Sequence, residues 1–208
     1  MRQKSYLYTL LAAFLLTGSL LHAQQGEMKA TISYAPAMPV GSFKDHINKT
    51  SLNGWNANLQ YGISDKFSIG GGVGFNDFYK KYPRQIYKTG EGSDISAVLT
   101  NSVQVIPVTV NARYHFMPES KVQPYAGINI GANIIMYEEL LGEYSNDSKS
   151  TVGFTGSPVA GVFIPFSKTG LTGIDLGAAY NYMPFKYGDI NGLDNLSVRL
   201  GISFPLRN

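Results

Sequence analysis

The feature that most constrains this chain is a two-residue alternation of apolar and small polar side chains, clearest in LSVRLGISF, Leu196 to Phe204. One set of alternate positions is entirely apolar: Leu196, Val198, Leu200, Ile202 and Phe204. The other set is small or charged: Ser197, Arg199, Gly201 and Ser203. A period of two predicts a β-strand with two unlike faces. Whether the apolar face contacts a protein core or lipid decides the fold class.

Residues 1–23 have the pattern of a cleaved signal peptide for export through the Sec pathway. Arg2 and Lys4 precede an apolar run of about 13 residues, Thr9 to Leu21, and Leu21-His22-Ala23 supplies a cleavage site. The run is shorter than the ~20 residues that a transmembrane helix needs. No later apolar run reaches that length, so we expect residues 24–208 to form one domain that crosses a membrane, if at all, with strands.

The composition excludes several classes of function. The chain has no cysteine, so it holds no disulfide, no thiolate metal site and no lipid-anchored amino terminus. Two of the 17 Lys and Arg residues lie in the signal segment, which leaves 15 against 14 acidic residues. This near-neutral balance gives no indication of nucleic-acid binding, and no nucleic-acid partner is expected.

Eight segments show the alternation and are bounded by turn residues: roughly 28–36, 54–63, 67–77, 103–116, 123–137, 152–166, 171–183 and 195–204. The first, third, fifth and seventh connections are long, whereas the second, fourth and sixth are short and rich in turn residues. An even number of antiparallel strands with alternating short and long connections is typical of an outer-membrane barrel. The alternative is a soluble eight-stranded barrel such as a lipocalin.

Three observations favour the membrane barrel. The eight segments contain five charged residues, Lys29, Asp77, Arg113, Asp175 and Arg199, although a soluble barrel would carry charges along its water-facing side. The non-apolar face is small and polar, as in WNANLQYGI, and suits a narrow interior that side chains must fill. Aromatic residues gather at both ends of the apolar face, as in the interfacial girdles of membrane barrels. We therefore predict an all-β fold, an eight-stranded antiparallel transmembrane β-barrel with short periplasmic turns and long extracellular loops.

The signal peptide, the strand count, the early segment YAPAMPVGSFKD (Tyr34 to Asp45) and the closing LSVRLGISF resemble the small outer-membrane β-barrel domain family of the OmpA, OmpW and opacity-protein type. The resemblance covers essentially the whole mature chain and includes no catalytic signature. One departure is the end of the chain, where Phe204 is followed by Pro205-Leu206-Arg207-Asn208 rather than closing the sequence on the aromatic residue that the assembly machinery reads.

Catalytic and metal chemistry have little support in the sequence. His115 is expected at the luminal, periplasmic end of its strand, and His46 lies beside Asp45 in the first long loop. Two scattered histidines do not make a metal site, and no catalytic residue or cofactor is expected. The glycines of IGGGVGF (Ile69 to Phe75) are interpreted as luminal positions, because no helix pattern follows to form a phosphate-binding loop. A lipid-modifying enzyme is retained as a third hypothesis.

The second long connection, Phe78 to Ser102, is the candidate surface-ligand loop. It combines basic and aromatic side chains: Tyr79, Lys80, Lys81, Tyr82, Arg84, Tyr87 and Lys88. Such a mixture suits acidic sugars or the phosphates of lipopolysaccharide. The third long connection, Glu138 to Thr151, is acidic, and opposite charges should draw the two loops together over the barrel mouth.

Four charged residues occupy the inward set of alternate positions on their strands and are predicted to form one luminal cluster: Lys29, Arg113, Asp175 and Arg199. Asp175 and Arg199 lie on adjacent strands and are expected to pair, with Arg113 reaching from the opposite wall, so that the cluster closes the lumen. A separate possibility is a lateral opening for apolar molecules, because Pro107 and Pro158 cannot donate to the ladders on either side of the fifth strand. Inward-facing Ile135, Val159 and Phe163 would make part of that lumen apolar.

These features predict a non-enzymatic, monomeric protein of the bacterial outer membrane, with surface-exposed loops for membrane integrity or for binding envelope and surface ligands. The alternative, implied by the OmpW resemblance, is a narrow conduit for small apolar solutes. The expected partners are outer-membrane lipid and lipopolysaccharide and, during biogenesis, the barrel-assembly machinery and periplasmic chaperones.

Overall fold

The computed structural model describes residues 26–88, 94–142, 144–167, 171–188 and 190–206. The predicted signal peptide lies outside these residues. The described elements are β1 (Met28–Tyr34), β2 (Ala37–Pro39), α2 (Ser42–His46), β3 (Trp55–Gly62), β4 (Phe67–Lys81), β5 (Gln85–Lys88), β6 (Asp94–Ala97), β7 (Leu99–His115), β8 (Gln123–Leu141), β9 (Tyr144–Pro165), β10 (Gly173–Asn181), β11 (Lys186–Tyr187), β12 (Ile190–Asn191) and β13 (Asn195–Leu206). No helix among them is long and apolar enough to cross a membrane.

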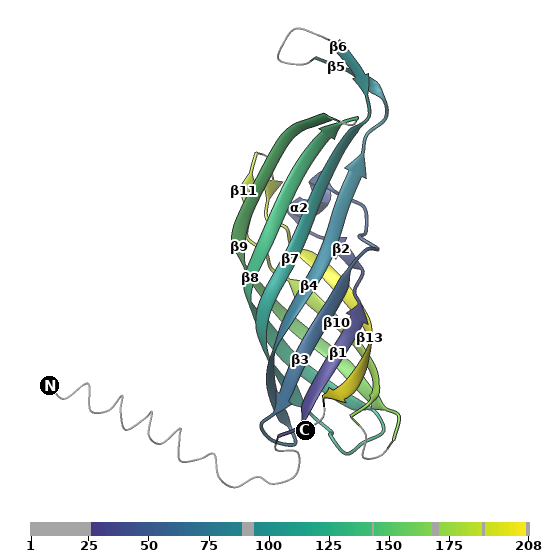
Figure 1. Cartoon of the computed structure of the whole chain (residues 1–208), viewed down its shortest axis with the longest axis vertical. Helices are drawn as coiled ribbons and strands as arrows, with labels where there is room; N and C mark the ends of the chain where they lie inside the picture. Colours follow the sequence, from purple (N-terminus) through teal and green to yellow (C-terminus); the bar gives the residue numbers. More distant parts are fainter. Residues whose placement is uncertain (1–25, 89–93, 143, 168–170, 189, 207–208) are drawn as a thin grey trace, which may run out of the picture.

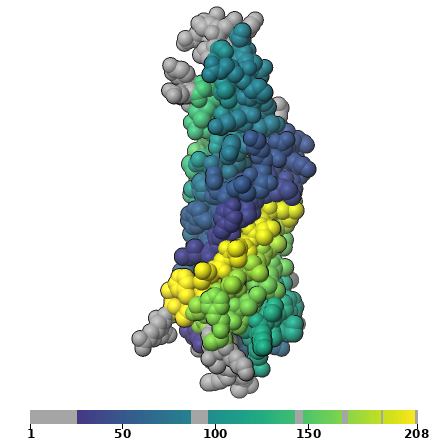
Figure 2. Space-filling view, turned by 90° about the vertical axis from the view of Figure 1, so that its right-hand side faces the viewer, coloured from purple at the N-terminus to yellow at the C-terminus, as the bar shows by residue number. Residues whose placement is uncertain are grey.

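Eight of these strands form a closed antiparallel ring in the order β1-β3-β4-β7-β8-β9-β10-β13 (Figure 1). The ring closes where β1 pairs with β13, with Met28 opposite Leu206 and Tyr34 opposite Leu200. In Figure 2 the two ends of the chain meet along this seam, as the yellow β13 crosses the surface between the purple β1 and the green β10. The short β2 adds to the upper end of β13. The predicted eight-stranded antiparallel barrel is confirmed.

The two faces of the strands take the sides that the alternation predicts. In β13, Val198, Leu200 and Ile202 are exposed on the outer surface, whereas Ser197, Arg199 and Ser203 are buried inside. A continuous apolar exterior of this kind is stable against hydrocarbon, where pairing between neighbouring strands of a closed ring satisfies the backbone groups that lipid cannot bind. The narrow interior is filled by side chains, in agreement with the ring of eight strands.

Four strands are longer than the sequence pattern predicts and form a tall wall on one side of the barrel (Figure 1). β4 continues to Lys81, β7 begins at Leu99, and the small β5–β6 hairpin stands at the top. The prediction of a long loop from Glu138 to Thr151 is wrong, because β8 continues to Leu141 and β9 begins at Tyr144. On β8 and β9 the extension is polar at Glu138–Glu139 and at Asp147–Thr151, so the apolar alternation ends there although the backbone ladder continues.

Candidate functional site

The lumen near the short-turn end holds a buried charge cluster, and the four predicted residues contribute to it. Arg113 is 1% exposed, and its Nη1 lies 3.8 Å from Oδ2 of Asp175. Tyr125 donates a hydrogen bond of 2.9 Å from its hydroxyl to Oδ1 of the same carboxylate. The Arg113 guanidinium also lies over the Tyr125 ring, 4.9 Å from its centroid, and donates to Gln60 Oε1 at 3.1 Å. Lys29 closes the cluster from β1, with its Nζ 3.9 Å from the centre of the Phe163 ring.

The predicted pair between Asp175 and Arg199 is wrong. Among the residues that the structure describes, the ion pair of Asp175 is with Arg113. The reason is the register between β10 and β13, which places Gly201 opposite Asp175 and sets Arg199 opposite Gly177, two residues farther along. Arg199 is nevertheless buried, at 4% exposure, and its Nε and Nη2 have no hydrogen-bond partner within the described protein.

Glycine at the inward position 177 makes room for this cluster. A Cβ added to Gly177 would lie 2.9 Å from the Tyr125 hydroxyl and 3.2 Å from Arg199 Nη2. The first distance is shorter than real Cβ contacts. The small luminal residues therefore determine where the large charged and aromatic side chains can lie.

His115 lies at the edge of this cluster, as predicted, at the short-turn end of β7. Its Nε2 is 3.5 Å from the Ser68 hydroxyl, and its ring is 5.8 Å from that of Tyr125. A hydrolytic triad also needs a carboxylate that orients the histidine. Asp175, the carboxylate of the cluster, instead accepts the hydrogen bond of Tyr125. His115 therefore contributes to a polar lining at the short-turn end of the lumen.

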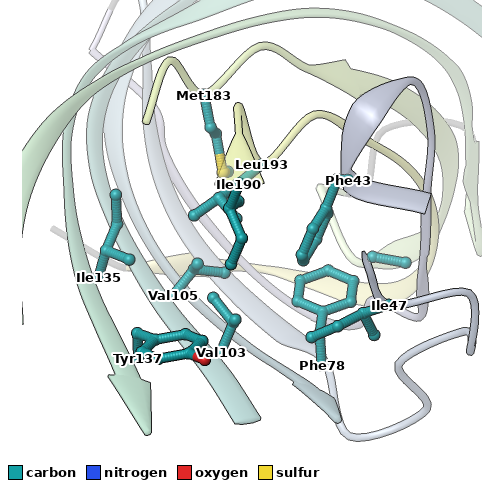
Figure 3. Close-up of a cluster of buried hydrophobic side chains, with 11 residues drawn as sticks. Phe43, Ile47, Phe78, Val103, Val105, Ile135, Tyr137, Met183, Ile190 and Leu193 are labelled. Carbon is teal, nitrogen blue, oxygen red and sulfur yellow. The ribbon is translucent and has the colours of Figure 1, made fainter. Parts of the chain in front are cut away.

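A second closure, which the sequence analysis missed, fills the opposite end of the lumen with apolar side chains (Figure 3). We call it the apolar plug; it consists of Ala37, Phe43, Ile47, Phe78, Val103, Val105, Ile135, Tyr137, Met183, Ile190 and Leu193. Its members come from the inner faces of β4, β7 and β8 and from the connections that follow β1 and β10. The Phe43 ring from α2 packs edge-on against that of Phe78, with centroids 5.0 Å apart.

A sequence signal for the plug exists. Inward positions change from small and polar to large and apolar in the upper part of the long strands, at Phe78, Val103 and Val105. The prediction that Ile135, Val159 and Phe163 face inward is confirmed by their burial. Only Ile135 belongs to the plug, since Val159 packs lower in the lumen with Tyr125.

The ladder gaps that Pro107 and Pro158 cause do not flank β8. The pairing of β8 runs through Pro107, opposite Asn133, and through Pro158, opposite Ile128. The interrupted pairings lie on the other side of each proline. Between β4 and β7 the ladder stops at Val73–Val108 and resumes at Asn76–Val105. Between β9 and β10 the ladder stops at Val159, with one isolated bridge beyond. The position where each proline lacks an N–H group therefore faces away from β8.

The candidate surface-ligand residues lie largely on strands rather than on a loop. Tyr79, Lys80 and Lys81 belong to β4, and Tyr87 and Lys88 to β5. Lys80 Nζ lies 4.9 Å from the centre of the Tyr82 ring, and Lys49 Nζ lies 5.7 Å from that of Tyr79. These basic and aromatic groups therefore share the upper edge of the wall.

The acidic side of the wall has its own contacts above the mouth. Tyr187 of β11 donates a hydrogen bond of 2.7 Å to Oδ2 of Asp147, which raises the pKa of the phenol. Lys149 lies 5.7 Å from the same ring. The basic and acidic segments lie on either side of β7, whose Asn101 pairs with Lys80 of β4 and with Glu139 of β8. Paired strands therefore stand where a contact between two loops was expected.

Comparison with known proteins identifies the architecture. A family model described as the outer membrane protein beta-barrel domain matches residues 9–204. Among solved structures, the chain is similar to OprG from Pseudomonas aeruginosa, with 14% identity over 89% of this chain and 98% of that chain and a TM-score of 0.50. It is also similar to Ail of Yersinia pestis, solved with the heparin analogue sucrose octasulfate, with 14% identity over 88% and 99% and a TM-score of 0.49. The E. coli outer membrane protein W gives 17% identity over 88% and 99% and a TM-score of 0.44. No curated protein matches the chain.

Proposed function

The chain belongs to the outer membrane protein beta-barrel domain family, and from that premise we propose that it is a non-enzymatic protein of the bacterial outer membrane whose closed barrel carries a ligand-binding wall at the cell surface. The observation that supports this proposal is the double closure of the lumen. The cluster around Arg113 and Asp175 fills one end, and the apolar plug fills the other. A barrel filled at two levels is suited to a structural or adhesive role rather than to general diffusion.

The wall provides the proposed binding surface, and its chemistry favours an anionic ligand. Lys80, on β4, lies against the Tyr82 ring, Lys81 ends the same strand, and Arg84 follows in an exposed position. Arginine and lysine pair with phosphate and sulfate groups, and aromatic rings pack against the faces of sugars. We therefore propose lipopolysaccharide phosphates or acidic surface glycans as the ligand. We further propose that the barrel works as a monomer in outer-membrane lipid and is delivered by periplasmic chaperones and the barrel-assembly machinery.

Neutralising the basic wall should weaken lipopolysaccharide binding. The variant Lys80→Gln/Lys81→Gln/Arg84→Gln removes one half-buried and two exposed charges, each worth up to about 1 kcal/mol at low salt, so we expect about tenfold weaker binding of purified lipopolysaccharide to the barrel in nanodiscs. The loss should shrink at high ionic strength because exposed charges are screened. A matched control, Lys66→Gln/Lys121→Gln, alters exposed lysines at the short-turn end. Equal binding by the two variants would contradict the assignment of the wall.

The second candidate function is a narrow conduit for small apolar solutes. It is favoured by the apolar upper lumen around Val105 and Ile135 and by the ladder gaps beside Pro107 and Pro158. An apolar solute would have to displace the plug residues and leave through one of those gaps.

Planar-bilayer recording separates the two functions. We expect the wild-type barrel to give no discrete conductance steps, because the charge cluster and the plug leave no continuous aqueous path. We also expect that expressing the closed barrel in cells that lack the gene leaves the uptake of a small alkane or aromatic compound unchanged. Regular steps in the bilayer, or faster uptake, would favour the conduit over the closed barrel.

A further inference from the structure

The charge balance of the lumen between the short-turn end and the apolar plug is uneven. The described inward-facing residues supply three cations there, Lys29, Arg113 and Arg199, and one carboxylate, Asp175. The interior therefore carries an excess of two positive charges. Burying an ion costs several kcal/mol unless a countercharge and hydrogen bonds offset the lost hydration. An interior of this kind favours the entry of an anion.

Arg199 is the cation that most needs such a partner. Its side chain is 4% exposed, and neither Nε nor Nη2 has a hydrogen-bond partner in the described protein. The same side chain lines a luminal cavity of about 40 Å³, which lies between the charge cluster and Met183 of the plug. A cavity of about 10–15 Å³ is already enough for a single water, so this one has room for a small ion together with one or two waters.

Polar side chains that can donate hydrogen bonds line this cavity. Ser197, two residues before Arg199 on the inner face of β13, accepts a bond of 3.1 Å from Asn181, which leaves its own hydroxyl hydrogen to donate. Asn76 and Asn129 also line the cavity, and the side-chain oxygen of each has no partner. A rotation about χ2 exchanges the two ends of an amide, so each can present its N–H₂ group to the cavity.

We propose that this cavity binds a monatomic anion of the halide class, with chloride as the natural occupant. The Nε and Nη2 groups of Arg199 and the hydroxyl of Ser197 hold the ion, and the asparagine amides complete its shell. The volume favours a halide over a phosphate, a sulfate or a carboxylate-bearing solute. The site goes beyond the proposed surface function, because it supplies the closed lumen with a countercharge and links barrel stability to the anion of the medium.

The test is thermal unfolding of the full barrel, folded in detergent micelles, in sodium chloride or sodium gluconate at equal ionic strength. Gluconate is too large for the cavity. We expect chloride to raise the midpoint of the wild-type barrel by about 2–4 °C, since a ligand that binds only the folded state stabilises it. Arg199→Met should lose this chloride dependence and, in gluconate, should melt no lower than the wild type. The matched control Lys121→Met changes an exposed cation at the short-turn end and should keep the full chloride effect.

Crystals grown in sodium bromide provide a second readout that needs no variant. The anomalous scattering of bromide should give a peak within hydrogen-bond distance of Arg199 Nε or Nη2. Equal chloride stabilisation in wild type, Arg199→Met and Lys121→Met would identify a general salt effect and overturn the proposal. An absent chloride effect, or a lumen with no bromide peak at Arg199, would assign the cavity to water and overturn it as well. If Arg199→Met does not fold, the bromide peak decides.

Discussion

Replacing Asp175 by alanine is expected to lower the thermal stability of the barrel substantially. The carboxylate is 2% exposed, pairs with Arg113 at 3.8 Å and accepts the Tyr125 hydroxyl at 2.9 Å. Its removal leaves Arg113 buried beside Lys29 without an anionic neighbour, and breaking a buried pair in this way typically costs about 3–5 kcal/mol. For a domain of this size the midpoint should fall by about 6 °C or more in detergent micelles.

Two further variants distinguish a lost charge from a lost side chain. Asp175→Asn keeps a hydrogen-bond acceptor for Tyr125 and should lose less stability than Asp175→Ala. The double variant Asp175→Ala/Arg113→Met removes both partners and should recover part of the loss, as expected of residues that are coupled. Glu119→Ala, in an exposed turn, is the matched control. A midpoint for Asp175→Ala equal to that of Glu119→Ala would show that the cluster does not stabilise the barrel.

Replacing Phe43 by alanine is expected to release the plug while leaving the barrel wall intact. Phe43 is the buried residue of α2 and packs on Phe78 with ring centroids 5.0 Å apart. Truncating a buried phenylalanine costs about 3–5 kcal/mol. The ring of eight strands does not depend on α2, so the cost should appear as local opening rather than as global unfolding.

Trypsin cleavage measures that opening, since Lys44 and Lys49 are exposed on either side of the plug residue Ile47. Cleavage that tracks the population of the open form should be faster by about tenfold or more in Phe43→Ala. Leu52→Ala, at a residue that is 64% exposed in the same connection, should cleave like the wild type. The global midpoint should change little in either variant. Equal cleavage rates in all three proteins would contradict an anchoring role for Phe43.

The ring of eight strands is predictable from the sequence, because the constraint that shapes each strand is local. Each strand must present apolar residues to lipid and small residues to a narrow lumen, and this requirement repeats every two residues in segments such as Leu196 to Phe204. Turn residues at Ser64-Asp65-Lys66 and in the segment from Met117 to Val122 mark the short connections. The strand ends above the apolar band were not predictable in the same way. At Glu138 and Glu139 both faces are polar, and the ladder continues through backbone hydrogen bonds that carry no side-chain pattern.

What the sequence by itself determined is therefore the side of the wall on which each residue lies, including the inward direction of Arg113, Asp175 and Arg199. What only the tertiary structure decided is which of these residues meet. Contacts across the lumen depend on the register of every intervening pair of strands. Arg199 lies two residues away from the position opposite Asp175, so Asp175 forms its ion pair with Arg113, and Arg199 lines the cavity. The apolar plug depends in addition on two connections, far apart in the chain, that fold back into the same end of the closed ring. No local pattern contains this long-range geometry, because the alternation along a strand specifies which face a residue lies on and not how far along the barrel axis it lies.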